Sequence, residues 1–434
     1  MSRFFFVSLF LASISPATLP GFEPLYERAP IHYNETEEDT ILIRLIASAE
    51  PGGPLATGTD REILEQLLKA LEVPIESQVL VFSKTSAQNS RISPRTPRAI
   101  YFSDNAYVGW VQGGEIEVAT FDEKPGMVFH LVEMTSREGN QPPKLARERS
   151  CLNCHAGSAN QNLPGLMVRS VYADETGQPL FQAGTFHTRQ DSPIEERWGG
   201  WYVTGAVDHS GHLGNRLSKG DRAGNEVTVH PISEAALTTL DEVVNTEPYL
   251  HGGQSDVVAL MMLEHQVGVH NALIEANLTT QTTLHRHVEM QKAFGEPIDG
   301  PLSDTNTRVL ANVAERVLKE MLYVDEFVLP GGVEGSEAFQ KAFQRNERKY
   351  GTGRSLKDFR LYERLMKYRC SHLIYCDAFD QLPDEIRTII LEQLHGILTE
   401  PSSYPEFSHL SSSEREHILE IVSETLPRLS SSWK

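Results

Sequence analysis

The stretch AIYFSDNAYVGWVQGGEIEVATFDEKPGMVFHLVEM, residues 99–134, contains four short apolar runs separated by turn-forming residues. The runs at 99–102, 107–111, 116–121 and 126–134 are rich in Val, Ile, Tyr and Phe, and Gly, Asp, Asn and Pro lie between them. This pattern is typical of antiparallel strands joined by tight turns. Further strand-like runs lie at 78–82, 166–172, 180–186 and 201–207, so the middle of the chain is predicted to be a β-rich, mostly antiparallel domain.

Apolar residues at helical spacing flank this β-rich region on both sides. They predict helices at 35–49 and 60–71 before it, and at 255–277, 305–324 and 384–398 after it. Ser411 and Glu414 have the spacing of a capping box ahead of a last helix. We therefore predict an α+β chain with a signal peptide at 1–17, a β-rich, haem-bearing domain at 18–235 and an all-helical domain at 236–434.

The first residues have the pattern of a secretory signal. Arg3 precedes an apolar run at 4–14, and the small residues Ser15 and Ala17 follow it. The run is shorter than the roughly 20 residues that cross a bilayer. We expect a periplasmic or secreted protein, and a buried N-terminal helix is the alternative interpretation.

The net negative charge of the chain bears on which kinds of binding partner are expected. The 434 residues include 39 Lys and Arg against 59 Asp and Glu, a formal net charge of -20. Nucleic acids and anionic membranes repel such a chain, so we expect neither as a partner. The apolar run at 257–263 is too short to span a bilayer, and no membrane span is expected in the mature chain.

Cys151-Leu152-Asn153-Cys154-His155 is a CxxCH pentapeptide, the attachment signature of c-type haem. Two thiols three residues apart face one side of a helical turn, where each can add to one haem vinyl group. The adjacent His155 supplies an imidazole to the iron. The single motif predicts one covalent haem c, with Cys151 and Cys154 binding the porphyrin and His155 as the proximal ligand.

Two other uses of CxxC are weaker. A structural zinc site needs a second ligand pair, and none has a convincing spacing. A redox dithiol of the thioredoxin type does not require the histidine. The remaining cysteines, Cys370 and Cys376, are expected to be buried thiols, and a local disulfide is the alternative.

The second axial ligand decides what such a haem does, because a closed iron suits electron transfer and an open one binds small molecules. The candidates near the motif or on a long helix are Met127, Met134, Met167, His187, His212 and His265. We choose His212 first and Met167 second. His265 is more simply explained as a hydrogen-bonded helix histidine.

Haem propionates need cationic partners, for which the arginine fork is suited. The candidates are Arg91, Arg95, Arg98, Arg147 and Arg149. Solvated surface arginines are the alternative interpretation, and the sequence does not choose among the five.

Several stretches resemble the exported monohaem cytochrome c domain proteins of planctomycete-type bacteria, a poorly characterised family. They are SQVLVFSKTS (77–86), RISPRTPRAIYF (91–102), SCLNCH (150–155), RWGGWYVTG (197–205), HLGN (212–215), DVVALMMLEHQ (256–266) and GRSLKDF (353–359). The resemblance covers most of the mature chain. It implies haem binding at Cys151, Cys154 and His155 with electron transfer as the usual function, and it implies no substrate.

The leading hypothesis is an exported c-type cytochrome that transfers single electrons to an unidentified redox partner protein and is not itself an enzyme. The alternative is a peroxidase-like haem enzyme, or a redox or gas sensor, with an open distal site. A third interpretation is a binding module in which the haem has only a structural role.

Overall fold

The computed structural model describes residues 23–47, 58–134, 143–207, 211–220, 227–233, 235–351, 353–426 and 433. Its centre is a six-stranded antiparallel sheet in the order β1-β2-β3-β4-β5-β6. The strands are β1 (Val79–Val81), β2 (Arg98–Phe102), β3 (Ala106–Trp110), β4 (Ile116–Asp122), β5 (Gly126–Glu133) and β6 (Lys144–Arg147). The antiparallel sheet predicted from the 99–134 stretch is confirmed. The predicted signal peptide lies outside the described residues.

Eight shorter strands form four two-stranded pairs. The pairs are β7 (Arg169–Val171) with β8 (Thr185–His187), β9 (Ala206–Val207) with β12 (Val333–Glu334), β10 (Arg216–Gly220) with β11 (Val227–Pro231), and β13 (Phe359–Tyr362) with β14 (Arg364–Met366). Three of these strands, β12, β13 and β14, lie beyond residue 236. The prediction of an all-helical C-terminal part is therefore wrong. Runs of two to four residues are too short to show a period of two.

The helices longer than one turn are α1 (Ile41–Ala47), α2 (Asp60–Ala70), α4 (Val257–Phe294), α5 (Asp304–Met321), α6 (Glu337–Phe343), α8 (Asp384–Thr399) and α9 (Ser412–Thr425). The short helices α3 (Leu152–His155) and α7 (Asp377–Asp380) complete the set of α-helices in the described part. Helix α4 continues well past the predicted end at 277. It stops at Gly295, whose φ of 69° gives the left-handed cap that glycine adopts without strain.

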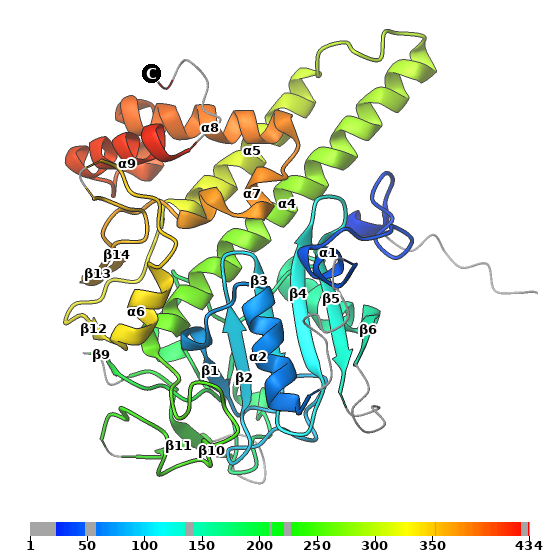
Figure 1. The fold of residues 1–434 in the computed structure, drawn as a ribbon. Helices are drawn as coiled ribbons and strands as arrows, with labels where there is room; N and C mark the ends of the chain where they lie inside the picture. The colour runs from blue at the N-terminus through cyan, green and yellow to red at the C-terminus, as the bar shows by residue number, and fades with distance from the viewer. Residues whose placement is uncertain are drawn as a thin grey trace, which may run out of the picture.

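The sheet lies between two apolar layers. In Figure 1, α2 lies in front of the sheet and α4 passes behind it. One core joins α1 and α2 to residues such as Tyr101, Val108 and Val118. The larger core joins α4 to the opposite sheet face, including Tyr107 and Phe129. Because side chains alternate along each strand, neighbouring residues serve different cores.

The larger core includes residues from both sides of residue 235. The sheet face and the C-terminal helices α4, α5, α8 and α9 bury apolar side chains in this one cluster. The described part of the chain is thus an α+β fold with the sheet first and most helices after it. The division into two domains at 235 stays a prediction.

Helix α4 is long and apolar enough to cross a bilayer by length and composition alone. However, 94% of its most apolar 18-residue stretch is buried inside the fold. A central core helix of a globular protein has this pattern, so α4 is weak evidence for a membrane span.

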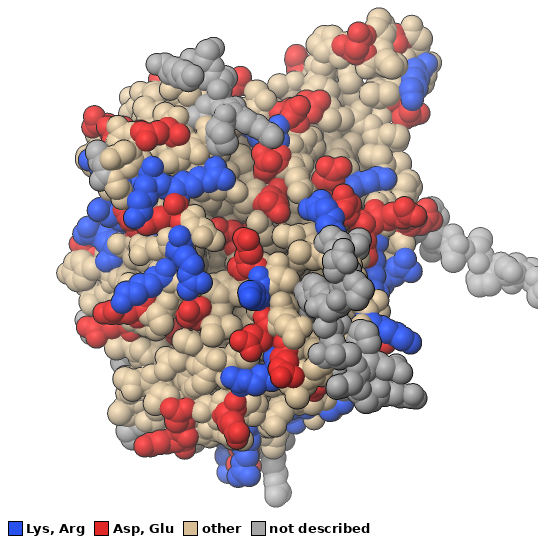
Figure 2. Space-filling model, in the orientation of Figure 1, with Lys and Arg blue, Asp and Glu red and all other residues tan. Residues whose placement is uncertain are grey.

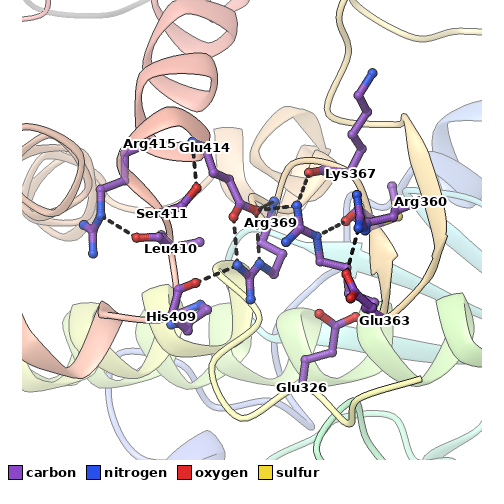
Figure 3. Close-up of polar contacts among 12 residues, drawn as sticks. Glu326, Arg360, Glu363, Lys367, Arg369, His409, Leu410, Ser411, Glu414 and Arg415 are labelled. Atoms are coloured by element: carbon purple, nitrogen blue, oxygen red, sulfur yellow. Dashed lines mark hydrogen bonds and ion pairs between the residues drawn. The ribbon is translucent and has the colours of Figure 1, made fainter. Parts of the chain in front are cut away.

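The predicted capping box at the start of α9 is half formed. The Ser411 hydroxyl accepts from the Glu414 backbone N–H at 3.2 Å. The Glu414 carboxylate, however, pairs with Arg369, whose Nη2 lies 2.8 Å from Oε2 (Figure 3). This ion pair ties α9 to the segment after β14.

Charged side chains of both signs are interspersed over the face shown in Figure 2. On that face neither sign forms one broad patch.

Candidate haem-attachment site

The CxxCH pentapeptide forms a compact helical turn. A 3-10 turn at Arg149–Cys151 leads directly into α3, Leu152–His155. Glu148 begins the turn by accepting the Ser150 backbone N–H at 2.8 Å. Cys151 is half-buried, Cys154 is exposed, and both thiols are free. The two sulfurs are three residues apart on one turn, which is the spacing that attachment to two vinyl groups needs.

The His155 imidazole is held in one tautomer. Its Nδ1 lies 2.8 Å from the Gly165 carbonyl oxygen, which can only accept, so Nδ1 carries the proton and donates. Burial lowers the pKa of His155, which keeps the ring neutral. The lone pair is therefore on Nε2, the form in which histidine ligates a metal.

Helix α4 fixes the loop that carries Gly165. The Leu166 N–H donates to Asn271 Oδ1 at 2.8 Å, and Asn271 Nδ2 donates to the Leu166 carbonyl at 2.8 Å. A Cβ on Gly165 would clash with the Asn271 side chain. The close approach of loop and helix therefore requires glycine at 165.

The motif packs beside the α4-side face of the sheet. The ring centroids of His155 and Phe129, on β5, are 4.6 Å apart. Burial and the nearby carboxylates of Glu117 and Glu148 raise the pKa of Cys151 to about 12. Free Cys151 is thus a poor nucleophile in the folded chain.

Arg98 on β2 is the cation next to the motif. It lies across Gly109, where a Cβ would clash with the guanidinium, and pairs with Glu117. Its charge partly opposes the rise in the pKa of Cys151 and adds to the lowering, by burial, of the pKa of His155. The buried Nε of Arg98 makes no hydrogen bond within the described part of the chain. A carboxylate such as a haem propionate fits this donor.

The other proposed propionate partners differ from Arg98. Arg147 donates to the Thr36 and Tyr33 carbonyls, and Arg149 donates to the Asn34 carbonyl. Their donors serve the backbone of the N-terminal segment.

Met167 and His187, two candidates for the distal ligand, line a cavity of about 460 Å³ together with Gly165. Their assignment as distal ligands stays a prediction.

Three further candidates have other partners. His265 Nδ1 lies 2.7 Å from Gln190 Oε1 and its Nε2 lies 2.8 Å from Ser371 Oγ, so both ring nitrogens are used. Met127 is buried in the core on the α4 side of the sheet. Met134 belongs to the core on the opposite side.

His212 is half-buried and packs edge-on against Trp198, with ring centroids 5.2 Å apart. Its assignment as the distal ligand stays a prediction.

The alternatives to haem gain no support from local geometry. The described residues contain no group of three or more His, Cys, Asp or Glu side chains arranged to hold a metal ion. Cys370 and Cys376 are both buried free thiols, as expected from the sequence.

No family model, no curated protein and no solved structure matches this chain. The assignment of the site therefore rests on the residues and contacts described above.

Proposed function

We propose that this protein is an exported c-type cytochrome that binds one haem and transfers single electrons. The observation that supports the proposal best is the 2.8 Å bond from His155 Nδ1 to Gly165, beside two free thiols in a CxxCH turn. This bond gives the neutral imidazole the orientation and tautomer that haem ligation uses.

Each residue of the site has a role in this proposal. Cys151 and Cys154 would hold the porphyrin by thioether bonds, and His155 would supply the axial nitrogen. Arg98 would neutralise a propionate, and Phe129 would exclude water beside the imidazole. The haem, when bound, supplies a one-electron couple whose potential depends on ligands, charge and burial.

A peroxidase-like enzyme or gas sensor is the second candidate. The hydrogen bonds of both ring nitrogens of His265 favour it, because they leave this candidate without a free nitrogen for the iron. Without a protein ligand on the distal side, the iron is open to peroxide or a diatomic gas.

Production in a host with working cytochrome maturation tests haem binding. We expect a coloured protein with a mass increment of one haem, absent from the C151A/C154A double variant. C370A is the matched control, because Cys370 is a free thiol outside the motif. A colourless wild-type protein of unmodified mass would contradict the proposal.

Carbon monoxide separates the two candidates. A reduced low-spin protein that binds no CO supports the electron carrier. Rapid CO binding by a high-spin form supports the enzyme or sensor. If His212 is the distal ligand, the H212A variant should change from a low-spin form that binds no CO to a high-spin form that binds CO rapidly.

A further inference from the structure

Tyr107 on β3 and His270 on α4 form a buried hydrogen-bonded pair. The Tyr107 Oη lies 2.6 Å from His270 Nδ1, and the two rings are edge-on at 5.6 Å. Both residues lie in the interior, with His270 only 2% exposed and Tyr107 6% exposed. Neither has a role in the haem-attachment site described above.

The partner distinguishes Tyr107 from the other well-buried tyrosines with hydrogen bonds in the described residues. Tyr33, Tyr202 and Tyr249 donate to backbone carbonyls, and Tyr101 donates to a glutamine side chain. Amide oxygens do not take up a proton at ordinary pH, whereas a neutral imidazole does.

The surroundings of the pair favour joint proton and electron transfer. Burial raises the pKa of Tyr107 well above 10, so the phenol does not ionise on its own. Burial lowers the pKa of His270 to about 4, so its ring is neutral and able to accept a proton.

The carboxylate of Asp104 would stabilise a protonated His270, because its charge acts to raise the pKa of that ring. Asp104 is itself held by Lys357 at 2.8 Å and His372 at 3.2 Å, and His372 acts on His270 in the opposite direction. Cys376 is the remaining titratable group that acts on Tyr107. Asp104 also lines a pocket of about 360 Å³.

The pair is linked to the proximal histidine by two short routes. On the sheet, Tyr107 is paired with Ala119, and Ala119 with Phe129, whose ring contacts His155. Two strand spacings make the separation of Tyr107 and Phe129 about 10 Å. On α4, His270 is followed by Asn271, which holds the loop that carries the carbonyl partner of His155.

We infer that Tyr107 is a redox-active tyrosine that gives one electron to an oxidant on the haem side while its proton moves to His270. This inference rests on the second candidate function, in which the haem iron is open to a peroxide. The oxidant belongs to the class of peroxides.

The Tyr107 O–H bond breaks, the proton binds Nδ1 of His270, and a neutral phenoxyl radical remains. Reduction of a peroxide to two waters takes two electrons and two protons. Tyr107 supplies one of these electrons; a bound haem would supply the other, and solvent the two protons. One electron from the redox partner protein, with return of the proton from His270 Nδ1, restores the phenol.

The first experiment is freeze-quench electron paramagnetic resonance on the haem-loaded full chain mixed with hydrogen peroxide. We expect a tyrosyl radical signal that is lost in Y107F and retained in Y249F, the matched buried tyrosine that donates to a carbonyl. H270Q keeps a hydrogen-bond acceptor but removes the base, so it too should lose the signal. An unchanged signal in Y107F, or none in folded haem-loaded wild type, overturns the inference.

A second experiment does not require haem. Azide radicals generated by pulse radiolysis oxidise the full-length C151A/C154A variant, and the long-lived phenoxyl absorbance is followed. We expect the long-lived phenoxyl absorbance to disappear when the Y107F substitution is introduced into this variant, and to persist when Y249F is introduced instead. Equal decay of the phenoxyl absorbance in the Y107F and Y249F variants would overturn the inference. Because this experiment needs no haem, failure of the inference can be distinguished from failure of haem binding.

Discussion

The side-chain amide of Asn271 forms hydrogen bonds with both the N–H and the carbonyl of Leu166, each at 2.8 Å, although the two residues are 105 positions apart in the sequence. A side-chain amide that pairs with one peptide in this way fixes both the position and the plane of that peptide. The neighbouring Gly165 carbonyl then accepts from His155 Nδ1. Helix α4 therefore helps to fix the orientation of the His155 imidazole through this loop.

Asn271→Ala should loosen this loop. The loss of two hydrogen bonds and the exposure of their buried partners should cost about 1–3 kcal/mol of unfolding free energy. In haem-loaded protein the reduction potential and the Soret spectrum should also shift, because His155 loses its fixed orientation. Urea unfolding and spectroelectrochemistry measure the two effects. An unchanged spectrum and potential would show that Asn271 has no positioning role.

Gly165→Ala should produce a similar change for a steric reason. The added methyl group meets the Asn271 side chain, so the loop must move away from α4. Gly157, where a Cβ would meet only the Cys154 and Asn153 carbonyls at 3.3 Å or more, is the comparison site. An equal effect at both glycines would contradict the specific contact with Asn271.

Arg197→Met should destabilise the fold strongly. Arg197 is 1% exposed and pairs at 2.8 Å with Glu264, which is fully buried on α4. Removing the cation leaves a carboxylate without its charge partner in the core, which should cost about 3–5 kcal/mol. The surface pair of Arg316 and Glu275 is the control, because R316M should cost less than about 1 kcal/mol. Equal losses in chemical denaturation would contradict the prediction.

Glu326 should make stability depend on pH. Burial raises its pKa to about 7, against the opposing effects of the Leu365 N–H, Arg369, Arg364 and Arg197. Figure 3 shows Glu326 in the same cluster as Arg369. A carboxyl whose pKa is raised by folding stabilises the fold below the unfolded value of 4.5. That contribution is lost as the pH rises towards 7.

Glu326→Gln should remove this part of the pH dependence, because the amide stays neutral and still accepts the Leu365 N–H. The variant should be more stable than wild type above neutral pH, and the difference should shrink in mild acid. Thermal melts across that pH range measure it, with the exposed Glu337→Gln as control. A constant difference at every pH would contradict the titration of Glu326.

The four cysteines should differ in reactivity when the chain is produced without haem. Burial raises the pKa of both Cys370 and Cys376 to about 12, whereas Cys154 is exposed. Iodoacetamide should modify Cys154 first and the two buried thiols only after unfolding. Peptide mass spectrometry reads the order. Modification of Cys370 at the rate of Cys154 would be the opposite result.

Local sequence patterns were enough to predict the central strands of the sheet and to locate the CxxCH motif. The strands from β2 to β5 follow one another through short turns, so alternation and turn residues predicted them. Cys151, Cys154 and His155 could be proposed from sequence because haem attachment requires residues close together in the chain, and this assignment stays a prediction.

Contacts between residues that are distant in the sequence could not be predicted from the sequence alone. Asn271 is one polar residue on a helix, and no spacing rule links it to Leu166. The pairing of β9 with β12 joins two-residue strands more than a hundred residues apart. The same limit applies to the distal side of the site. The second ligand of the iron depends on the paths of loops, which composition does not predict.

The larger of the two cores has a practical consequence for anyone who wishes to isolate the part of the chain that carries the CxxCH turn. A truncation at residue 235 would strip α4 from the sheet and leave the aromatic rings of Tyr107, Phe121 and Phe129 in water. Such a fragment should aggregate rather than fold on its own. The chain is therefore best handled, purified and engineered as one indivisible piece.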